Sequence, residues 1–263
     1  MNRIEKKFAR LKSLNKKVLI AFITAGYPDL EISEKIACVL EKNGVDVIEL
    51  GMPFSDPIAD GPTIQKSSYV SLKNGMNLKK FFGLVKNLRK KISTPLVMMS
   101  YYNPILKYGL ENFARQAAYV GLDGVIVPDL PPEEACDFRR CLKINGISLI
   151  FLISPLTEEK RIKKIAKLSS GFIYYVSLTG VTGARSILPD DLLRNVRKIK
   201  QLTAKPVCVG FGISQPEQVK AVLQSADGVI VGSAIIKIIE QNKKNKQLLS
   251  KVGSFISGLS KAK

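Results

Sequence analysis

Residues 47–63 read VIELGMPFSDPIADGPT, a short strand-like run followed by a loop rich in proline and glycine. The run carries Glu49 near its carboxyl end, and the loop carries Asp60. Alternate side chains of a strand share a face, so Glu49 points the same way as Val47 and Gly51. A glutamate among apolar neighbours is costly to bury as an anion, and it often persists because a raised pKa suits proton transfer. The other interpretations are a salt bridge inside a barrel or a strand end in contact with water.

On both sides of this stretch, short β-rich runs alternate with helical patterns. Such alternation argues for parallel strands joined by crossover helices. Eight strands, each followed by a helix-like segment, favour a closed (β/α)₈ barrel, whereas an open doubly wound sheet would show a glycine-rich turn after its first strand. The predicted strands are 18–24, 45–50, 95–100, 124–128, 148–153, 172–176, 206–210 and 228–232.

The helical patterns fill the intervals between these strands and add one helix before the first. A barrel of this kind needs about 250 residues, so the 263 residues predict a single (β/α)₈ TIM-barrel domain over 1–263. The sequences GLDGVIV (121–127) and SADGVIV (225–231) resemble each other and identify no function. The predicted helices are 2–14 (an extra N-terminal helix), 30–43, 62–73, 77–91, 110–120, 132–145, 158–169, 190–202, 215–225, 233–240 (a short extra helix after strand eight) and 246–260.

The amino-acid composition excludes several kinds of catalytic site and metal site. The chain contains no histidine, which excludes Ser-His-Asp and Cys-His catalysis and histidine-ligated zinc. Its four cysteines form no CxxC pair, so we expect reduced thiols and a cytoplasmic location. The net charge is +19, but the lysines spread over nearly every predicted helix and no nucleic-acid-binding motif accompanies them. No apolar run approaches the roughly 18 residues of a membrane helix. We therefore expect no nucleic-acid or membrane partner.

Several segments together resemble one enzyme family. They are ELGMPFSDPIADGPTIQ, FITAGYPD, YYVSLTGVTGAR, GFGISQPEQV and VGSAIIKIIE, and they are similar to the α subunit of tryptophan synthase over essentially the whole chain. The resemblance implies a lyase of tryptophan biosynthesis that cleaves indole-3-glycerol phosphate to indole and D-glyceraldehyde 3-phosphate. It also implies that Glu49 and Asp60 are the catalytic residues.

Two carboxylates suit a retro-aldol cleavage. Glu49, with a pKa raised by apolar surroundings, could act as acid and base in turn, while an ionised Asp60 would accept a hydrogen bond from the indole N–H. The reaction needs no metal, and we expect no metal site. No predicted strand ends in lysine, which weighs against Schiff-base aldolase chemistry and against indole-3-glycerol phosphate synthase, the nearest rival in the same pathway.

The substrate phosphate needs a cradle of backbone N–H groups, which this barrel class builds after strands seven and eight. Gly212, Gly232 and Ser233 stand at those two positions, although each glycine could be only a turn residue. The resemblance adds Gly183 to the cradle. It also matches Thr182, in the loop 178–185, to a threonine that approaches the catalytic pair from a closing lid.

Apolar and aromatic residues near the predicted strand ends could line an indole pocket, and each could equally be barrel core. The resemblance supports Phe22, Ile126 and Tyr174 best. Asp129 is a third carboxylate at a strand end, for which a capping or loop role is the alternative. The candidate lining residues are Phe22, Ile64, Ser100, Tyr101, Ile126, Tyr174 and Phe211.

A partner is implied only by the resemblance. The family works with a tryptophan synthase β subunit, which consumes the indole and carries pyridoxal phosphate, in an α₂β₂ heterotetramer. No cofactor is expected in this chain. Asp56 and Pro57 are the expected partner contacts, while turn formation is the other interpretation of Asp56. A catalytically weak α subunit that mainly activates its partner is the alternative function.

Overall fold

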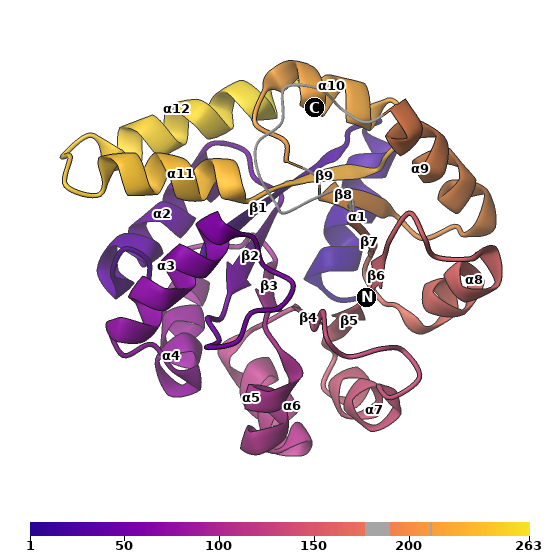
Figure 1. Cartoon of the computed structure of the whole chain (residues 1–263), viewed down its shortest axis with the longest axis horizontal. Coiled ribbons are helices and arrows are strands. Elements are labelled where there is room, and N and C mark those ends of the chain that lie inside the picture. Colours follow the sequence, from indigo (N-terminus) through magenta and orange to yellow (C-terminus); the bar gives the residue numbers. More distant parts are fainter. Residues whose placement is uncertain (177–189, 211) are drawn as a thin grey trace.

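A computed structural model describes residues 1–176, 190–210 and 212–263 of the chain. In the described residues, nine parallel strands form one sheet in the order β5-β4-β3-β2-β1-β9-β8-β7-β6. The strands at the two ends of this order, β5 and β6, are separated along the chain only by Phe151, so the sheet closes on itself (Figure 1). The predicted (β/α)₈ barrel is confirmed. The strands are β1 (Val18–Thr24), β2 (Val47–Gly51), β3 (Leu96–Met99), β4 (Gly124–Ile126), β5 (Ser148–Ile150), β6 (Leu152–Ile153), β7 (Ile173–Val176), β8 (Val207–Gly210) and β9 (Gly228–Val231).

The division of the fifth barrel strand differs from the prediction of one strand over 148–153. The amide of Phe151 donates to Ser169 Oγ at 3.3 Å. The Phe151 amide therefore bonds to a side chain, and not to a neighbouring strand, at the point where the strand changes its pairing partner. Before it β5 pairs with β4, and after it β6 pairs with β7.

The described helices follow the predicted pattern with two differences. A short helix, α5, begins directly after β3 and was not predicted, and α7 begins at Cys136 whereas the prediction began at 132. The helices are α1 (Arg3–Ser13), α2 (Leu30–Lys42), α3 (Pro62–Lys73), α4 (Leu78–Arg89), α5 (Tyr102–Tyr108), α6 (Leu110–Val120), α7 (Cys136–Ile144), α8 (Glu159–Leu168), α9 (Asp190–Leu202), α10 (Pro216–Leu223), α11 (Ser233–Asn242) and α12 (Leu248–Ser260).

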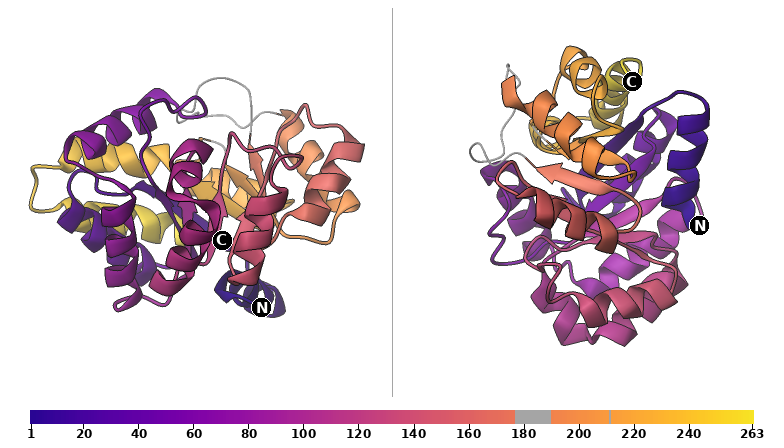
Figure 2. Two further views of the ribbon diagram at one scale, coloured as in Figure 1. Left: turned by 90° about the horizontal axis from the view of Figure 1, so that it is seen from below. Right: turned by 90° about the vertical axis from the view of Figure 1, so that its right-hand side faces the viewer.

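The extra N-terminal helix, α1, closes one end of the barrel (Figure 2). Its buried side chains Ile4, Phe8 and Leu11 join the apolar cluster inside the barrel. Its N-cap residue Asn2 donates to the backbone oxygen of Asp123 at 3.1 Å, just before β4 begins. The helix therefore covers the amino ends of the strands and leaves the carboxyl ends, where (β/α)₈ enzymes place their reactive groups, at the other end.

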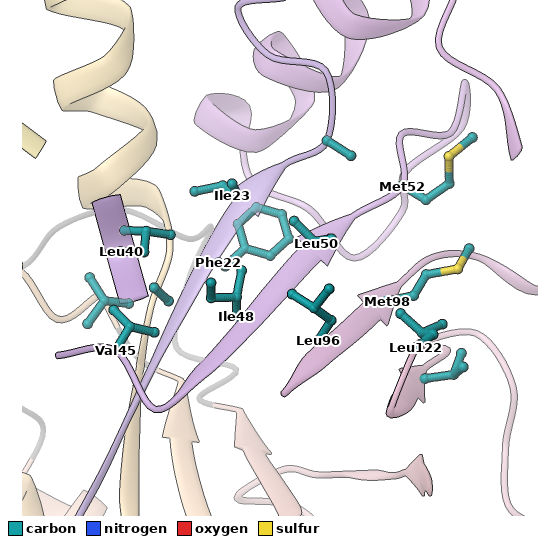
Figure 3. Close-up of a cluster of buried hydrophobic side chains, with 14 of the residues drawn as sticks. Phe22, Ile23, Leu40, Val45, Ile48, Leu50, Met52, Leu96, Met98 and Leu122 are labelled. Carbon is teal, nitrogen blue, oxygen red and sulfur yellow. The ribbon is translucent and has the colours of Figure 1, made fainter. Parts of the chain in front are cut away.

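The outer apolar layer lies between the strands and the surrounding helices. Figure 3 shows Ile48 and Leu50 of β2 with Leu96 and Met98 of β3, and Leu40 of α2 nearby. These residues alternate along each strand with members of the inner cluster, as the two faces of a strand require.

A repeated contact fastens the amino ends of the strands. Asp46, Asp123 and Asp227 stand just before β2, β4 and β9, and Ser170 occupies the corresponding place before β7. Each forms two hydrogen bonds with one residue near the start of a neighbouring strand. Its own N–H donates to the backbone oxygen of that residue, and its side chain accepts a hydrogen bond from the N–H of the same residue. Asp123 and Asp227 stand at the same position within the similar segments 121–127 and 225–231. The amides that donate to the four side chains, at 2.8–2.9 Å, are those of Leu19, Leu96, Val207 and Leu149, in the same order as the aspartates and the serine.

Candidate active site

Glu49 lies on β2 with its side chain turned into the barrel. The side chain is 1% exposed, and neither carboxyl oxygen has a hydrogen-bond partner among the described residues. Phe22 of β1 and Val97 of β3 are its partners in the sheet register. Loss of solvation, followed by the negative charge of Asp60, raises the pKa of Glu49 to about 8. A carboxyl group in these surroundings holds its proton at neutral pH.

Asp60 lies at the end of the loop that follows β2. The loop turns through hydrogen bonds from the Ile58 amide to the Asp56 oxygen (3.0 Å) and from the Asp60 amide to the Pro57 oxygen (3.2 Å). Burial raises the pKa of Asp60 to about 6, and a hydrogen bond from Tyr101 opposes the rise. Asp60 is therefore mostly ionised at pH 7, beside a protonated Glu49.

The phenol of Tyr101 faces the Asp60 loop. Its oxygen accepts a hydrogen bond from the Ala59 amide at 2.9 Å, and its ring stacks on Phe54 with the centroids 5.3 Å apart. Burial, and then the charge of Asp60, raise the pKa of Tyr101. The sequence suggested Tyr101 only as a pocket wall, and the structure adds this contact with the loop.

Two aromatic rings pack over glycines on neighbouring strands. A Cβ atom on Gly51 would lie 2.5 Å from the ring of Phe22, and one on Gly210 would lie 2.5 Å from the ring of Tyr174. Such contacts are shorter than side chains tolerate, so both rings need the glycines. No local sequence pattern points to Gly51 and Gly210 in this role, because the partner rings come from other strands.

Tyr174 is close to both carboxyl groups. The pKa of its phenol lies well above the usual value because of burial, and then because of the charges of Glu49 and Asp60. Tyr174 pairs with Cys208 in the sheet register and packs against the inner cluster. The structure thus places Glu49, Asp60, Tyr101 and Tyr174 around one region at the carboxyl ends of the strands.

The remaining predicted pocket residues lie on different layers. Ile126, at the end of β4, is fully buried in the inner cluster. Ile64, near the start of α3, is half-buried and packs against the outer layer, whereas Phe22 pairs with Glu49 in the sheet register and its ring packs over Gly51. Phe211 and Thr182 lie outside the described residues.

The predicted phosphate cradle combines a loop and a helix terminus. Gly212 has φ of +36°, a region that favours glycine. Gly232 is the N-cap of α11, Ser233 is the first helical residue, and no side chain caps this terminus. Backbone N–H groups at such a terminus suit an anion. Gly183, the other predicted member, lies outside the described residues.

Three further polar positions have separate places. Asp56 is exposed at the tip of its loop and Pro57 is half-buried beside it. The carboxylate of Asp129 accepts a hydrogen bond from the Tyr102 amide at 2.9 Å, so it caps α5, the alternative that the sequence left open. The hydroxyl of Ser100 is buried without a hydrogen-bond partner among the described residues.

The described residues contain neither a cluster of metal ligands nor a membrane-spanning helix. Over residues 1–176, 190–210 and 212–263, no three His, Cys, Asp or Glu side chains gather as metal ligands would. No helix in the same ranges has the length and apolar character that a membrane span requires.

A protonated buried carboxyl beside an ionised one, at the carboxyl ends of barrel strands, is the arrangement of a (β/α)₈ enzyme that works by acid–base chemistry. Residues 8–262 match the family described as tryptophan synthase alpha chain. The chain belongs to this family, whose members are lyases that cleave indole-3-glycerol phosphate.

Individual relatives agree over nearly the whole length. The tryptophan synthase alpha chain of Geotalea uraniireducens is 50% identical over 259 residues, which cover 98% of this chain and 97% of the relative. That of Geobacter sulfurreducens is 49% identical over 262 residues, covering 100% and 99%.

Solved structures show the same fold. The tryptophan synthase subunit alpha from Legionella pneumophila superposes with a TM-score of 0.93 at 40% identity, covering 100% of this chain and 98% of that one. A chain of the tryptophan synthase complex from Pyrococcus furiosus gives 0.85 at 40% identity, covering 92% and 97%.

Proposed function

We propose that this chain cleaves indole-3-glycerol phosphate with Glu49 as the proton donor and acceptor and Asp60 as the ionised partner. The observation that carries the proposal is the buried Glu49 carboxyl, which has no hydrogen-bond partner among the described residues. Burying such a group costs folding free energy. A role in proton transfer gives a reason for that cost.

The proton balance of the cleavage fits one carboxyl group. Protonated Glu49 delivers its proton to C3 of the indole ring, and the resulting carboxylate takes the proton of the C3′ hydroxyl. The bond between C3 and C3′ then breaks, its electrons restore the aromatic ring, and the hydroxyl carbon becomes the aldehyde of glyceraldehyde 3-phosphate. Glu49 ends in its starting protonation state.

Asp60 stabilises the charged ring that forms between these steps. Once C3 carries a proton, the indole nitrogen bears positive charge, and an ionised carboxylate that accepts its N–H hydrogen bond lowers the energy of that state. The pKa of about 6 supports this role, because Asp60 is mostly charged at pH 7.

The rest of the substrate would bind along the barrel mouth. Gly212, Gly232, Ser233 and the predicted Gly183 would hold the phosphate through backbone N–H groups. Phe22, Ile64, Ile126 and Tyr174, with the predicted Phe211 and Thr182, would surround the indole. A Cβ atom on Gly232 would lie 3.3 Å from the side chain of Phe22. This closeness supports a phosphate site that lies next to the indole site.

The product points to a partner subunit. Indole is small and apolar, so direct transfer to a second active site would prevent its loss. We propose a tryptophan synthase β subunit as that partner, carrying the pyridoxal phosphate, in an α₂β₂ assembly, while this chain uses no cofactor of its own. Asp56 and Pro57 would contact the partner, and Ile58, which is 83% exposed on the same loop, offers apolar area. The four free thiols fit a cytoplasmic location.

The test is release of indole from indole-3-glycerol phosphate by the purified chain, alone and with its β subunit. We expect the wild type to release indole, and Glu49→Gln and Asp60→Asn to be slower by at least about a hundredfold. Asp56→Asn, an exposed carboxylate on the same loop, is the matched control and should keep the activity of the isolated chain. Near-normal release by either catalytic variant would overturn the proposal. If the wild type were inactive alone and served only to stimulate the β subunit, the alternative of a catalytically weak activator would stand instead.

A further inference from the structure

Tyr101 connects two loops at the mouth of the barrel. It follows β3, and its side chain is 4% exposed. Its ring stacks on Phe54 at an interplanar angle of 29°, while its oxygen accepts the Ala59 amide at 2.9 Å. Phe54 and Ala59 stand near the two ends of the loop that leads to Asp60. Tyr101 therefore contacts this loop at both places.

The hydrogen-bond capacity of the phenol directs its proton. A tyrosine hydroxyl has one proton to donate and can also accept. The Ala59 amide occupies an acceptor position, so the phenol proton is available to the neighbouring Asp60 carboxylate, whose pKa the Tyr101 hydroxyl lowers. An ionised carboxylate accepts a stronger hydrogen bond than a protonated carboxyl does. The Tyr101 hydroxyl therefore favours the charged form of Asp60, and it favours one orientation of that side chain.

The backbone on both sides of Tyr101 is fastened to the next strand. The Ser100 amide donates to the oxygen of Ile126 at 3.1 Å. The Tyr102 amide donates to the Asp129 carboxylate at 2.9 and 3.2 Å. The two acceptors, Ile126 and Asp129, belong to β4 and to the residues just after it. The barrel therefore fixes the backbone of Tyr101, and the side chain of Tyr101 can fix the loop that leads to Asp60.

We propose that Tyr101 is a positioning residue that orients Asp60 for the cleavage, with Asp129 as its support, and that it does not act as a wall of the indole pocket. The inference rests on the proposed function, because it takes Asp60 as the acceptor of the indole N–H.

The electrostatic setting gives the proposal a distinctive pH dependence. The titratable groups that face Asp60 are Glu49 of β2, Tyr101 after β3 and Tyr174 of β7, and Asp129 faces Tyr101. Among these, the hydrogen bond from Tyr101 lowers the pKa of Asp60 against the effect of burial. Removing the phenol proton must raise that pKa, and the acid limb of kcat/KM then moves to higher pH.

Tyr101→Phe removes the hydroxyl and keeps the ring that stacks on Phe54. We expect kcat for indole release to fall about ten- to hundredfold, the effect of one hydrogen bond to a charged group, with KM changed less than about threefold and the acid limb moved upward. Tyr102→Phe, which removes the neighbouring hydroxyl, is the matched control and should leave all three unchanged. A pocket wall would give the opposite result, a raised KM with the acid limb in place.

A second variant tests the support without touching the loop. Asp129→Ala removes the acceptor of the Tyr102 amide and should move the acid limb in the same direction by a smaller amount. Carbon-13 NMR titration of the Asp60 carboxyl in Tyr101→Phe measures the pKa directly, even if that variant were too slow to assay. An unchanged Asp60 pKa and unchanged kcat would overturn the inference. Failure of the proposed function is separable, because it would appear as normal indole release by Asp60→Asn, whatever Tyr101→Phe does.

Discussion

Glu49 should make the stability of the folded chain fall as the pH rises. Its ordinary pKa is 4.5, and burial raises the pKa of the folded form to about 8. The folded state therefore binds one more proton than the unfolded state between these two values. The ionisation of Glu49 costs the folded state nothing below pH 4.5, a growing amount as the pH rises to about 8, and a constant amount above that.

The magnitude follows from the same two values. Each pH unit in this interval costs the folded state about 1.4 kcal/mol, so the loss at pH 7 is roughly 3 kcal/mol. Glutamine does not titrate, and any cost of burying its amide is the same at every pH. The difference in free energy of unfolding between Glu49→Gln and wild type should therefore grow in favour of the variant between pH 5 and 8.

Urea unfolding followed by far-UV circular dichroism measures this difference, since the chain has no tryptophan to serve as a fluorescent probe. The two proteins are compared at each half pH unit from 5 to 8.5. Asp56→Asn, which removes an exposed carboxylate from the neighbouring loop, is the control and should follow the wild-type curve. Parallel curves for Glu49→Gln and wild type would contradict the raised pKa, because they would mean that Glu49 ionises normally in the folded protein.

Three other substitutions test the scaffold and the substrate contacts. Asp123→Ala leaves the guanidinium of Arg89, which donates to it at 3.1 Å, without its carboxylate, so urea unfolding should show a loss of about 3 kcal/mol while the folded fraction keeps its turnover; an unchanged midpoint would contradict this. Gly210→Ala places a Cβ atom 2.5 Å from the ring of Tyr174, so indole release should fall more than thermal stability, and equal wild-type turnover would show that the ring position is unimportant. Gly212→Val forces a branched side chain into a backbone with φ of +36°, and KM for the substrate should rise about tenfold or more; a normal KM would exclude Gly212 from the phosphate cradle.

The barrel could be predicted from sequence because its elements are local and repeated. Each strand run stands between helical patterns, and eight such units leave few alternatives. The helix α5 was missed because Asn103-Pro104 is a turn-like pair and the helix spans only seven residues. Its N-terminal contact comes from Asp129, on a distant part of the chain. The break at Phe151 likewise depends on a side chain from another segment, Ser169.

The candidate site shows the same limit. Glu49 could be selected because a carboxylate stands out in an apolar strand, whereas Asp60 precedes a glycine, could equally be a turn residue, and was selected through the family resemblance. The roles of Gly51 and Gly210 depend on rings from neighbouring strands, so no local pattern reveals them. The direction of the Tyr101 hydroxyl is equally invisible in sequence, since it follows from how two loops meet.

The pH dependence of kcat/KM for indole release from indole-3-glycerol phosphate shows which protonation states of Glu49 and Asp60 the cleavage requires, because it reports the ionisation of the free enzyme. With Asp60 required as the anion and Glu49 required as the acid, we expect a bell-shaped profile for the carboxyl pair, with limbs near pH 6 and pH 8. Activity that stays constant or continues to rise from pH 7 to 9.5 would contradict it, since a protonated Glu49 would then have no part in the cleavage.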